Sequence, residues 1–305
     1  MTDLPTHAPP ELTWRIGGGR SLDLRSPVVM GVLNVTPDSF SDGGRFLARS
    51  AAADRALAML DEGADVVDIG GESTRPGAAA VGSAEQIDRV VPVIRDVVER
   101  RPDALVSIDT TRADVAAAAV EAGAAIVNDV SGSTDDPRMS DVVIGLGVGF
   151  IVMHRHTTPD QDSFSDEYHR PPMSGDVVET TRGFLADQLA RFRALGGDSL
   201  RVVLDPGLGF GKDVGQNMDL IRRTGEIAQI GRPVVSGLSR KSFVGRVSLG
   251  RESRPDERDI GTAALTALHR SAGASVFRVH EPALALEALR CADAIGPIAD
   301  AAPKR

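Results

Sequence analysis

Eight short apolar runs recur along this chain, and polar or charged residues follow nearly every one of them. Segments with helical character separate the runs. A parallel strand that is buried on both faces reads as a continuous apolar run rather than an alternating one. Eight such strands separated by helices are expected to close into a single (β/α)8 TIM barrel. The predicted strands cover residues 28–35, 66–71, 105–108, 126–127, 150–153, 202–204, 234–238 and 276–279.

The chain has no internal break in composition, so one barrel domain is expected at residues 13–298. Two short strands at 13–16 and 21–24, joined by three glycines, predict a β-hairpin that would close the bottom of the barrel. Tails are predicted at 1–12, which is rich in Pro and Thr, and at 299–305. Helices are predicted at 50–63, 83–101, 112–123, 139–146, 177–195, 214–230, 257–273 and 282–294.

Composition argues against nucleic-acid and membrane partners. The net charge of −9 disfavours general nucleic-acid binding, although a local cluster of Arg and Lys could hold a small anion. No apolar run is long enough to cross a membrane. The single cysteine, Cys291, cannot form an internal disulfide, which fits a reducing cytoplasm. Its place in the last helix predicts a small core residue.

Polar residues at the strand ends predict where the active site lies, because such barrels carry their catalytic residues at the carboxyl ends of the strands. Asp109, Asn128 and Asp205 end the third, fourth and sixth strands. Together they would form a surface of acceptors and one amide. That surface suits a heterocycle with several N–H donors, such as a guanidine-like pyrimidinone edge. The alternative is that each side chain satisfies nearby backbone groups.

A cationic cluster is predicted at the ends of the seventh and eighth strands. Residues 239–242 (Ser-Arg-Lys-Ser) follow the seventh strand, and Arg278 and His280 end the eighth. TIM barrels often bind phosphate at this position. Asn34 ends the first strand, where it could offer an oxygen to a metal or an amide to a phosphate. The alternatives are a solvated basic surface and, at 34–44, an ordinary polar loop.

Two motifs do not support the reading that they first suggest. The glycine-rich segment 207–212 fails the Walker A pattern, because Pro206 stands where the first glycine should be. Glycines that let the backbone approach a flat ligand explain this segment better. His154, His156 and His169 lack the rigid spacing of a zinc site.

Two of the loops that follow strands are long, at 36–49 and 155–174. Long loops on a barrel top often act as lids or extend into solvent. The second loop is polar and has no apolar period. Residues 161–172 are therefore predicted to be mobile and outside the chemical site. Arg155 and His156 directly follow the fifth strand and could reach the mouth of the pocket.

Several of these segments together resemble dihydropteroate synthase. The resemblance runs from about Val28 to Ile295, and its first two motifs are long and specific. It departs from the usual pattern of the family at 154–159, after the fifth strand. The motifs are 34–44 (NVTPDSFSDGG), 68–77 (DIGGESTRPG), 107–109 (SID), 128–132 (NDVSG), 205–212 (DPGLGFGK), 239–242 (SRKS) and 278–280 (RVH).

The resemblance implies a transferase of folate biosynthesis that joins 6-hydroxymethyl-7,8-dihydropterin pyrophosphate to p-aminobenzoate with Mg²⁺. The products are 7,8-dihydropteroate and pyrophosphate, and the family is the sulfonamide target and usually dimeric. A methyltetrahydrofolate methyltransferase would share the pterin acceptors but would not need Thr74-Arg75-Pro76. A non-catalytic pterin-binding paralogue is the other alternative. Loss of Asn34, Lys241 or Arg278 would favour it, and the chain retains all three.

The resemblance also implies roles for single residues around the pterin. The ring edge would be bound by Asp109, Asn128 and Asp205. The rest of the ring system would contact Met153, Phe210, Gly237 and Lys241. The implied catalytic residues are Asn34, Lys241, Arg278 and His280.

The other two substrate groups have implied sites as well. The pyrophosphate would be held by Asn34, Arg278 and His280, with Asn34 also near Mg²⁺. The p-aminobenzoate site would be shaped by Phe40, Thr74, Arg75 and Pro76 from two mobile loops. Ser242, at the start of the helix after the seventh strand, would receive the carboxylate, because a helix N-terminus favours an anion.

Overall fold

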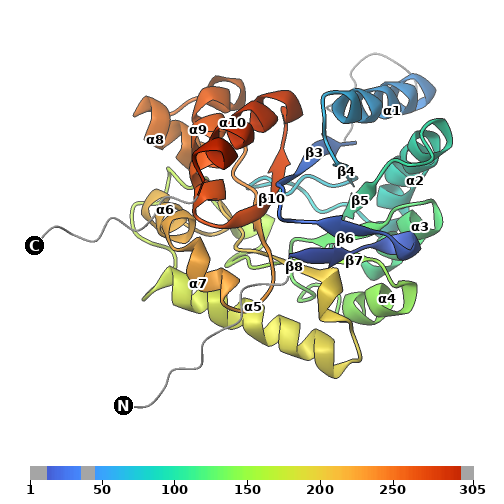
Figure 1. The fold of residues 1–305 in the computed structure, drawn as a ribbon, viewed down its shortest axis with the longest axis horizontal. Coiled ribbons are helices and arrows are strands. Elements are labelled where there is room, and N and C mark those ends of the chain that lie inside the picture. The colour runs from blue at the N-terminus through green and yellow to red at the C-terminus, as the bar shows by residue number, and fades with distance from the viewer. Residues whose placement is uncertain (1–11, 36–44, 297–305) are drawn as a thin grey trace, which may run out of the picture.

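The chain folds into a closed barrel of eight parallel strands, as predicted. The computed structural model describes residues 12–35 and 45–296. The barrel strands are β3 (Val28–Asn34), β4 (Val66–Gly70), β5 (Val106–Asp109), β6 (Ile126–Asp129), β7 (Gly149–Met153), β8 (Val202–Asp205), β9 (Val234–Ser236) and β10 (Ala274–Val279). Each strand pairs with its neighbours in chain order, and β10 closes the ring onto β3 (Figure 1). The TIM barrel is thereby confirmed.

Helices surround the barrel. They are α1 (Arg45–Asp61), α2 (Ser83–Arg100), α3 (Ala113–Glu121), α4 (Met139–Leu146), α5 (Val177–Ala194), α6 (Val214–Arg222), α7 (Thr224–Ala228), α8 (Ser242–Leu249), α9 (Asp259–Ser271) and α10 (Pro282–Ile295). The prediction of a single helix at 214–230 is wrong, because the helix is interrupted at Arg223. There the Thr224 hydroxyl donates to the carbonyls of Leu220 and Ile221.

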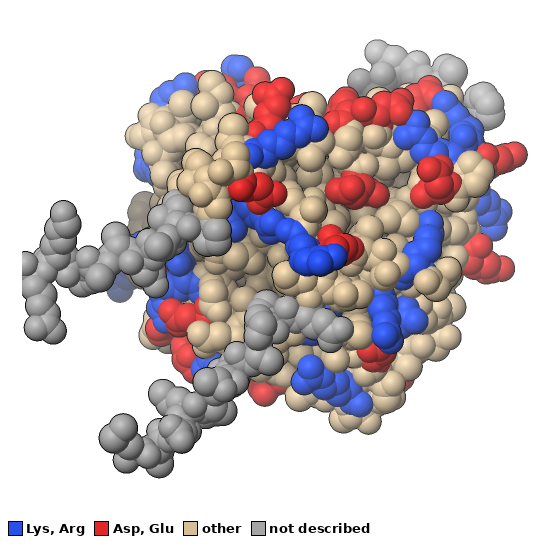
Figure 2. Space-filling view, in the orientation of Figure 1, with Lys and Arg blue, Asp and Glu red and all other residues tan. Residues whose placement is uncertain are grey.

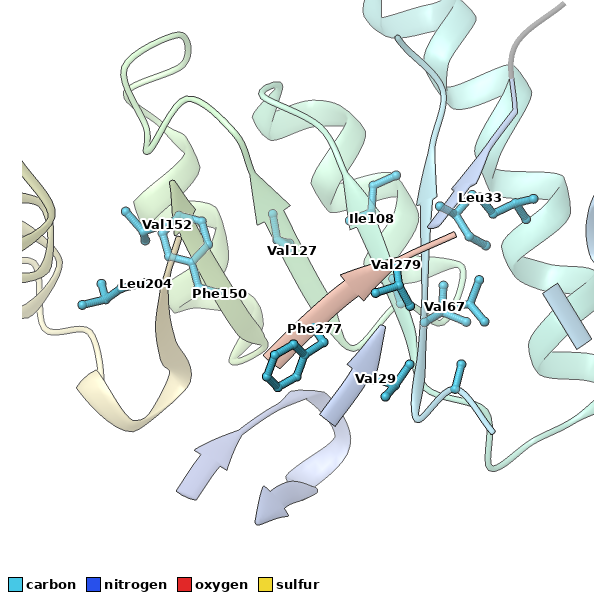
Figure 3. Packing of buried hydrophobic residues seen from close by; sticks show 14 of the residues in the cluster. Val29, Leu33, Val67, Ile108, Val127, Phe150, Val152, Leu204, Phe277 and Val279 are labelled. Carbon is cyan, nitrogen blue, oxygen red and sulfur yellow. The ribbon is translucent and has the colours of Figure 1, made fainter. Parts of the chain in front are cut away.

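The strands bury side chains on both faces, which explains their continuous apolar character. The outward side chains pack under the helices; Figure 3 labels several of them, including Val29, Val67 and Phe277. The inward side chains, such as Met30 and Val276, form a second cluster inside the barrel. Successive residues of a strand point to opposite faces, so inward positions recur every second residue. This period decides which residues reach the site.

The predicted hairpin is confirmed and plugs one end of the barrel. It consists of β1 (Thr13–Arg15) and β2 (Ser21–Asp23), joined by a 3-10 turn at Gly17–Gly19. Trp14 is fully buried in the inner cluster, and its indole N–H donates to the carbonyl of Arg201 at 2.7 Å. The hairpin therefore closes the end of the barrel that is opposite the strand carboxyl ends.

Two smaller expectations need correction. The predicted tails lie outside the described residues except for Leu12, whose carbonyl accepts the N–H of Leu24 at 2.7 Å and so belongs to the hairpin. Cys291 is exposed rather than in the core, because α10 turns Ala285, Leu289 and Ala292 inward.

No helix among the described residues is long and apolar enough to cross a membrane. On the face shown in Figure 2, Lys and Arg alternate with Asp and Glu. The described residues therefore form no continuous basic surface on that face.

Candidate active site

A cavity of about 490 Å³ opens at the carboxyl ends of the strands. Its walls come from β3, from the loops that follow β4, β7, β8, β9 and β10, and from α8 and the segment after it. Most of the residues that the resemblance implicated line it. They are Asn34, Thr74, Arg75, Pro76, Phe210, Gly237, Lys241, Ser242, Arg278 and His280.

Of the five other predicted residues, the four that the structure describes do not line this cavity. Phe40 lies outside the described residues. Asp109, Asn128, Met153 and Asp205 are all buried. Asp109 pairs with Arg278, while Met153 packs in one cluster with Phe210. These side chains form a polar and apolar layer beneath the cavity.

A buried network links this layer to the cavity. The Arg278 guanidinium donates from Nε to Asp68 Oδ2 and from Nη2 to Asp109 Oδ2, each at 2.6 Å. Asn128 donates from Nδ2 to the same Asp68 oxygen at 2.9 Å. Asp68 is fully buried and was not predicted. Its position gave a signal, since it stands on β4 two residues from the inward-facing Val66.

Two oxygen atoms of this network have no hydrogen-bond partner within the described structure. They are Asp68 Oδ1 and Asn128 Oδ1, and both are buried. A buried acceptor without a partner costs about 1–3 kcal/mol. A ligand with N–H donors, or water, would remove that cost.

The balance of charge in the network sets the protonation of its carboxylates. Burial raises the pKa of Asp109, whereas the Arg278 guanidinium lowers it. Burial also raises the pKa of Asp205, opposed by Lys241. For Arg278, burial lowers the pKa, but Asp68 and Asp109 overcome this effect and raise it. Arg278 is therefore cationic and neutralises part of the acidic layer.

Lys241 lies against a glycine-rich loop. Its ammonium is 4.2 Å from the centre of the Phe210 ring and donates to the carbonyl of Leu208. Burial lowers the pKa of Lys241 to about 7, while Asp205 acts in the opposite direction. Gly209 has a φ of 79°, and a Cβ there would lie 2.6 Å from Lys241 Cδ. The glycine therefore makes room for the lysine.

Lys212 holds the same loop from inside and was not predicted as a site residue. It is fully buried, and its ammonium donates to the carbonyls of Gly207 at 2.8 Å and Phe210 at 3.0 Å. Burial lowers the pKa of Lys212 to about 7. A cation that satisfies several carbonyls fixes the shape of the loop that carries Phe210.

His280 does not add positive charge to the free protein, contrary to the sequence-based expectation. Burial, together with the nearby charges of Arg278 and Arg240, lowers its pKa to about 3. Its Nδ1 lies 2.9 Å from the Ser239 hydroxyl. The neutral ring can still offer its other nitrogen to a ligand in the cavity.

The prediction that residues 161–172 lie outside the site is wrong. Phe164, Ser165, Asp166 and Glu167 line the cavity. This position follows from contacts that a single sequence does not reveal. The Asp162 carboxylate accepts the N–H of Gly211 at 3.0 Å, and Ser165 accepts from Asn217 at 3.2 Å.

The same loop also meets the loop that follows β4. The N–H of Gly77 donates to the carbonyl of Pro159 at 2.8 Å. Neither Arg155 nor His156 lines the cavity, and Arg155 pairs with Asp135 instead. Two loops that are distant in the chain therefore build one wall.

The side chains that could act as metal ligands decide which metal ion the site could bind. Among the described residues, no three His, Cys, Asp or Glu side chains are grouped to hold an ion. His154 packs edge-on against the Phe184 ring on α5. Mg²⁺ needs only one or two protein oxygens when phosphate and water supply the rest. The carboxamide of Asn34 on the cavity wall fits that requirement.

Comparison with known proteins agrees with the family that the motifs indicate. The model of the family described as pterin binding enzyme matches residues 30–280. The chain belongs to the pterin-binding enzyme family and, within it, to the dihydropteroate synthases. A dihydropteroate synthase of Mycobacterium leprae is 42% identical over 265 residues, which are 86% of this chain and 91% of the relative.

Solved dihydropteroate synthases share the fold at similar identity. The Xanthomonas albilineans enzyme with 4-aminobenzoic acid has a TM-score of 0.83 and 39% identity, covering 95% of this chain and 100% of that one. Its complex with 7,8-dihydropteroate has a TM-score of 0.79 and 36% identity, with the same coverage. The family therefore accounts for nearly the whole chain.

The contact between Gly209 and Lys241 can be tested by substitution. Gly209→Ala adds backbone strain and a clash, so we expect a loss of about 1–3 kcal/mol in the free energy of unfolding. Gly175→Ala is the control, because Gly175 has a similar φ of 76° but no atom within 4 Å of the added carbon. Urea unfolding of both variants measures the difference. Equal losses would contradict the close approach of Lys241.

Proposed function

We propose that the chain condenses 6-hydroxymethyl-7,8-dihydropterin pyrophosphate with p-aminobenzoate, forming 7,8-dihydropteroate and releasing pyrophosphate. One observation carries the proposal: a single cavity joins a buried layer of acceptors to a mouth lined by Arg278, Lys241 and a histidine. The acceptors suit the N–H groups of a pterin, and the cations suit a pyrophosphate. A methyltransferase would need the acceptors for the pterin but not the cations for a pyrophosphate.

The pterin end of the reaction depends on acceptor atoms. Asp109, Asn128 and Asp205 would receive the N–H groups of the ring edge, and the unpartnered oxygens of Asp68 and Asn128 support this role. Phe210 and the ammonium of Lys241 would contact the ring system. Each buried acceptor that gains a donor removes a desolvation cost, so the ring edge is recognised by its hydrogen-bonding pattern.

The pyrophosphate end depends on charge. Arg278 and His280 would donate to the leaving group and stabilise the negative charge that develops as the C–O bond breaks. We propose Asn34 as the protein ligand of Mg²⁺, in keeping with its place in the cavity lining. When bound, Mg²⁺ would offset further charge on the pyrophosphate. A non-catalytic paralogue would have no need for this set of donors.

We propose that pyrophosphate departs early and leaves a cationic methylene on the pterin. The carboxylates of Asp109 and Asp205 would stabilise that cation. The arylamine nitrogen then forms the C–N bond and afterwards loses a proton, so no strong general base is needed. Thr74, Arg75 and Pro76 would shape the arylamine site, and Ser242 would receive its carboxylate at the N-terminus of α8. The surrounding loops would exclude water, which could capture the cation.

Arg278→Ala tests the role of the guanidinium. We expect kcat/KM to fall by about 10²-fold or more, because a contact that strengthens in the transition state is lost. The measurement is pyrophosphate release with and without p-aminobenzoate. Arg138→Ala serves as control, since its side chain is exposed and outside the cavity. Normal turnover of Arg278→Ala would refute the assignment.

The order of substrate binding provides a second test. The arylamine site is built partly from loops, so it should form only after pyrophosphate orders them. Calorimetry should detect little binding of p-aminobenzoate to the free protein and clear binding once a pterin, pyrophosphate and Mg²⁺ are present. The same affinity in both states would show that the site is preformed.

We further propose that the chain is a cytoplasmic homodimer. Three exposed apolar side chains support an interface on α8 and α9, namely Val247, Leu249 and Ile260. The two helices meet where a Cβ on Gly261 would touch Ser248.

Ile260 is 85% exposed, so Ile260→Asp should leave the fold intact and dissociate the dimer. Sedimentation velocity measures this, and a wild-type monomer would contradict the proposal.

A further inference from the structure

A strained turn connects β9 to α8 and carries the residues that reach into the cavity. The N–H of Lys241 donates to the carbonyl of Leu238 at 3.2 Å, so residues 238–241 form a four-residue turn. Arg240, the third residue of that turn, has a φ of 59°. Glycine is the residue that adopts such a conformation without steric cost. Among the described residues, only Ser133 is a second non-glycine with positive φ.

The turn is held by contacts with neighbouring segments. The backbone N–H of Arg240 donates to the Thr262 hydroxyl at 3.1 Å, and its carbonyl accepts from Arg258 Nη1 at 2.8 Å. The Arg240 guanidinium donates to both carboxylate oxygens of Asp259, at 2.7 and 2.9 Å. It also donates to Glu281 at 2.7 Å. Residues of α9, of the segment before it and of the start of α10 therefore fix this conformation.

The residues on either side of Arg240 point in different directions. The Ser239 hydroxyl contacts His280 at Nδ1 and also accepts its backbone N–H at 3.2 Å. Lys241 instead extends over the Phe210 ring. A reversal of the backbone between them is what permits both contacts. Ser242 then begins α8.

We propose that Arg240 is a positioning residue for the reaction. Its side chain couples the strained turn to Asp259 and Glu281, and the turn in turn orients Ser239, Lys241 and Ser242 in the cavity. Strain held at an active site by surrounding contacts is a recognised way to fix a productive geometry. The inference rests on the proposed function, because the reaction is one of its readouts.

Two other roles for Arg240 predict different outcomes. The side chain lines the cavity, so it could contact an anionic substrate directly. It could also stabilise the fold without affecting the chemistry. Asp259 separates these roles, because it binds the Arg240 fork but does not line the cavity.

The experiment compares Arg240→Gly, Arg240→Ala, Asp259→Asn and the double variant Arg240→Gly/Asp259→Asn. Arg240→Gly removes the coupling but adopts the positive φ freely, so its melting temperature should be no lower than that of Arg240→Ala. We expect its kcat/KM for p-aminobenzoate to fall by about ten- to a hundredfold, as small misplacements of reacting groups can do. Asp259→Asn should reproduce much of that fall, and the double variant should be no worse than Arg240→Gly.

Several results would overturn the proposal. Wild-type kinetics in Asp259→Asn would favour a direct contact between Arg240 and substrate. Lower melting temperatures with unchanged kinetics would indicate a purely structural role. If Arg240→Gly does not fold, Arg240→Lys replaces it, since lysine keeps the charge but cannot form the fork. Its kinetics are then judged by the same criteria.

A binding readout separates this proposal from the proposed function. Inorganic pyrophosphate binding is measured by calorimetry in the wild type and each variant. Absence of turnover in the wild type would defeat the proposed function but leave this comparison possible. A weaker pyrophosphate affinity in Asp259→Asn would support the positioning role through Ser239 and His280. An unchanged affinity, together with unchanged kinetics, would reject it.

Discussion

Charge buried inside the barrel is the constraint on which the rest of the site depends. Asp68 and Asp109 have almost no contact with solvent, and the Arg278 guanidinium is shared between them. Removing one partner from a buried ion pair is strongly destabilising, because the other charge is left uncompensated. The barrel can therefore carry an acidic layer only if β10 supplies a cation at the right level. That cation then faces the cavity, where it is available for an anionic leaving group.

The second requirement is the alternation of side chains along each strand. Apolar inward residues such as Met30 and Val276 fill the lower barrel together with the hairpin. Polar residues at the same inward positions, two residues further along, begin the layer beneath the cavity. Arg278 follows Val276 in this way, and Asp68 follows Val66. The core and the site are therefore two levels of one packing arrangement inside the barrel. The hairpin closes the level that is farther from the cavity.

The loops add precision through backbone contacts. Lys212 satisfies carbonyls of the loop that carries Phe210, and Asp162 accepts an N–H from the end of that loop. Arg240 is held by both its backbone and its side chain. Lys212, Asp162 and Arg258 thus use charged side chains to hold backbone groups of the loops around the cavity. A search of the sequence for reactive side chains does not identify such groups.

The sequence by itself determined the eight strands, the hairpin and the residues that end the strands, because burial on both faces leaves a continuous apolar run. The motifs also pointed to the family. Only the tertiary structure revealed the role of Asp68, the neutral His280 and the cavity wall at Phe164. These features depend on pairings between residues far apart in the chain. A side chain's charge and direction follow from what surrounds it, and local sequence does not contain that information.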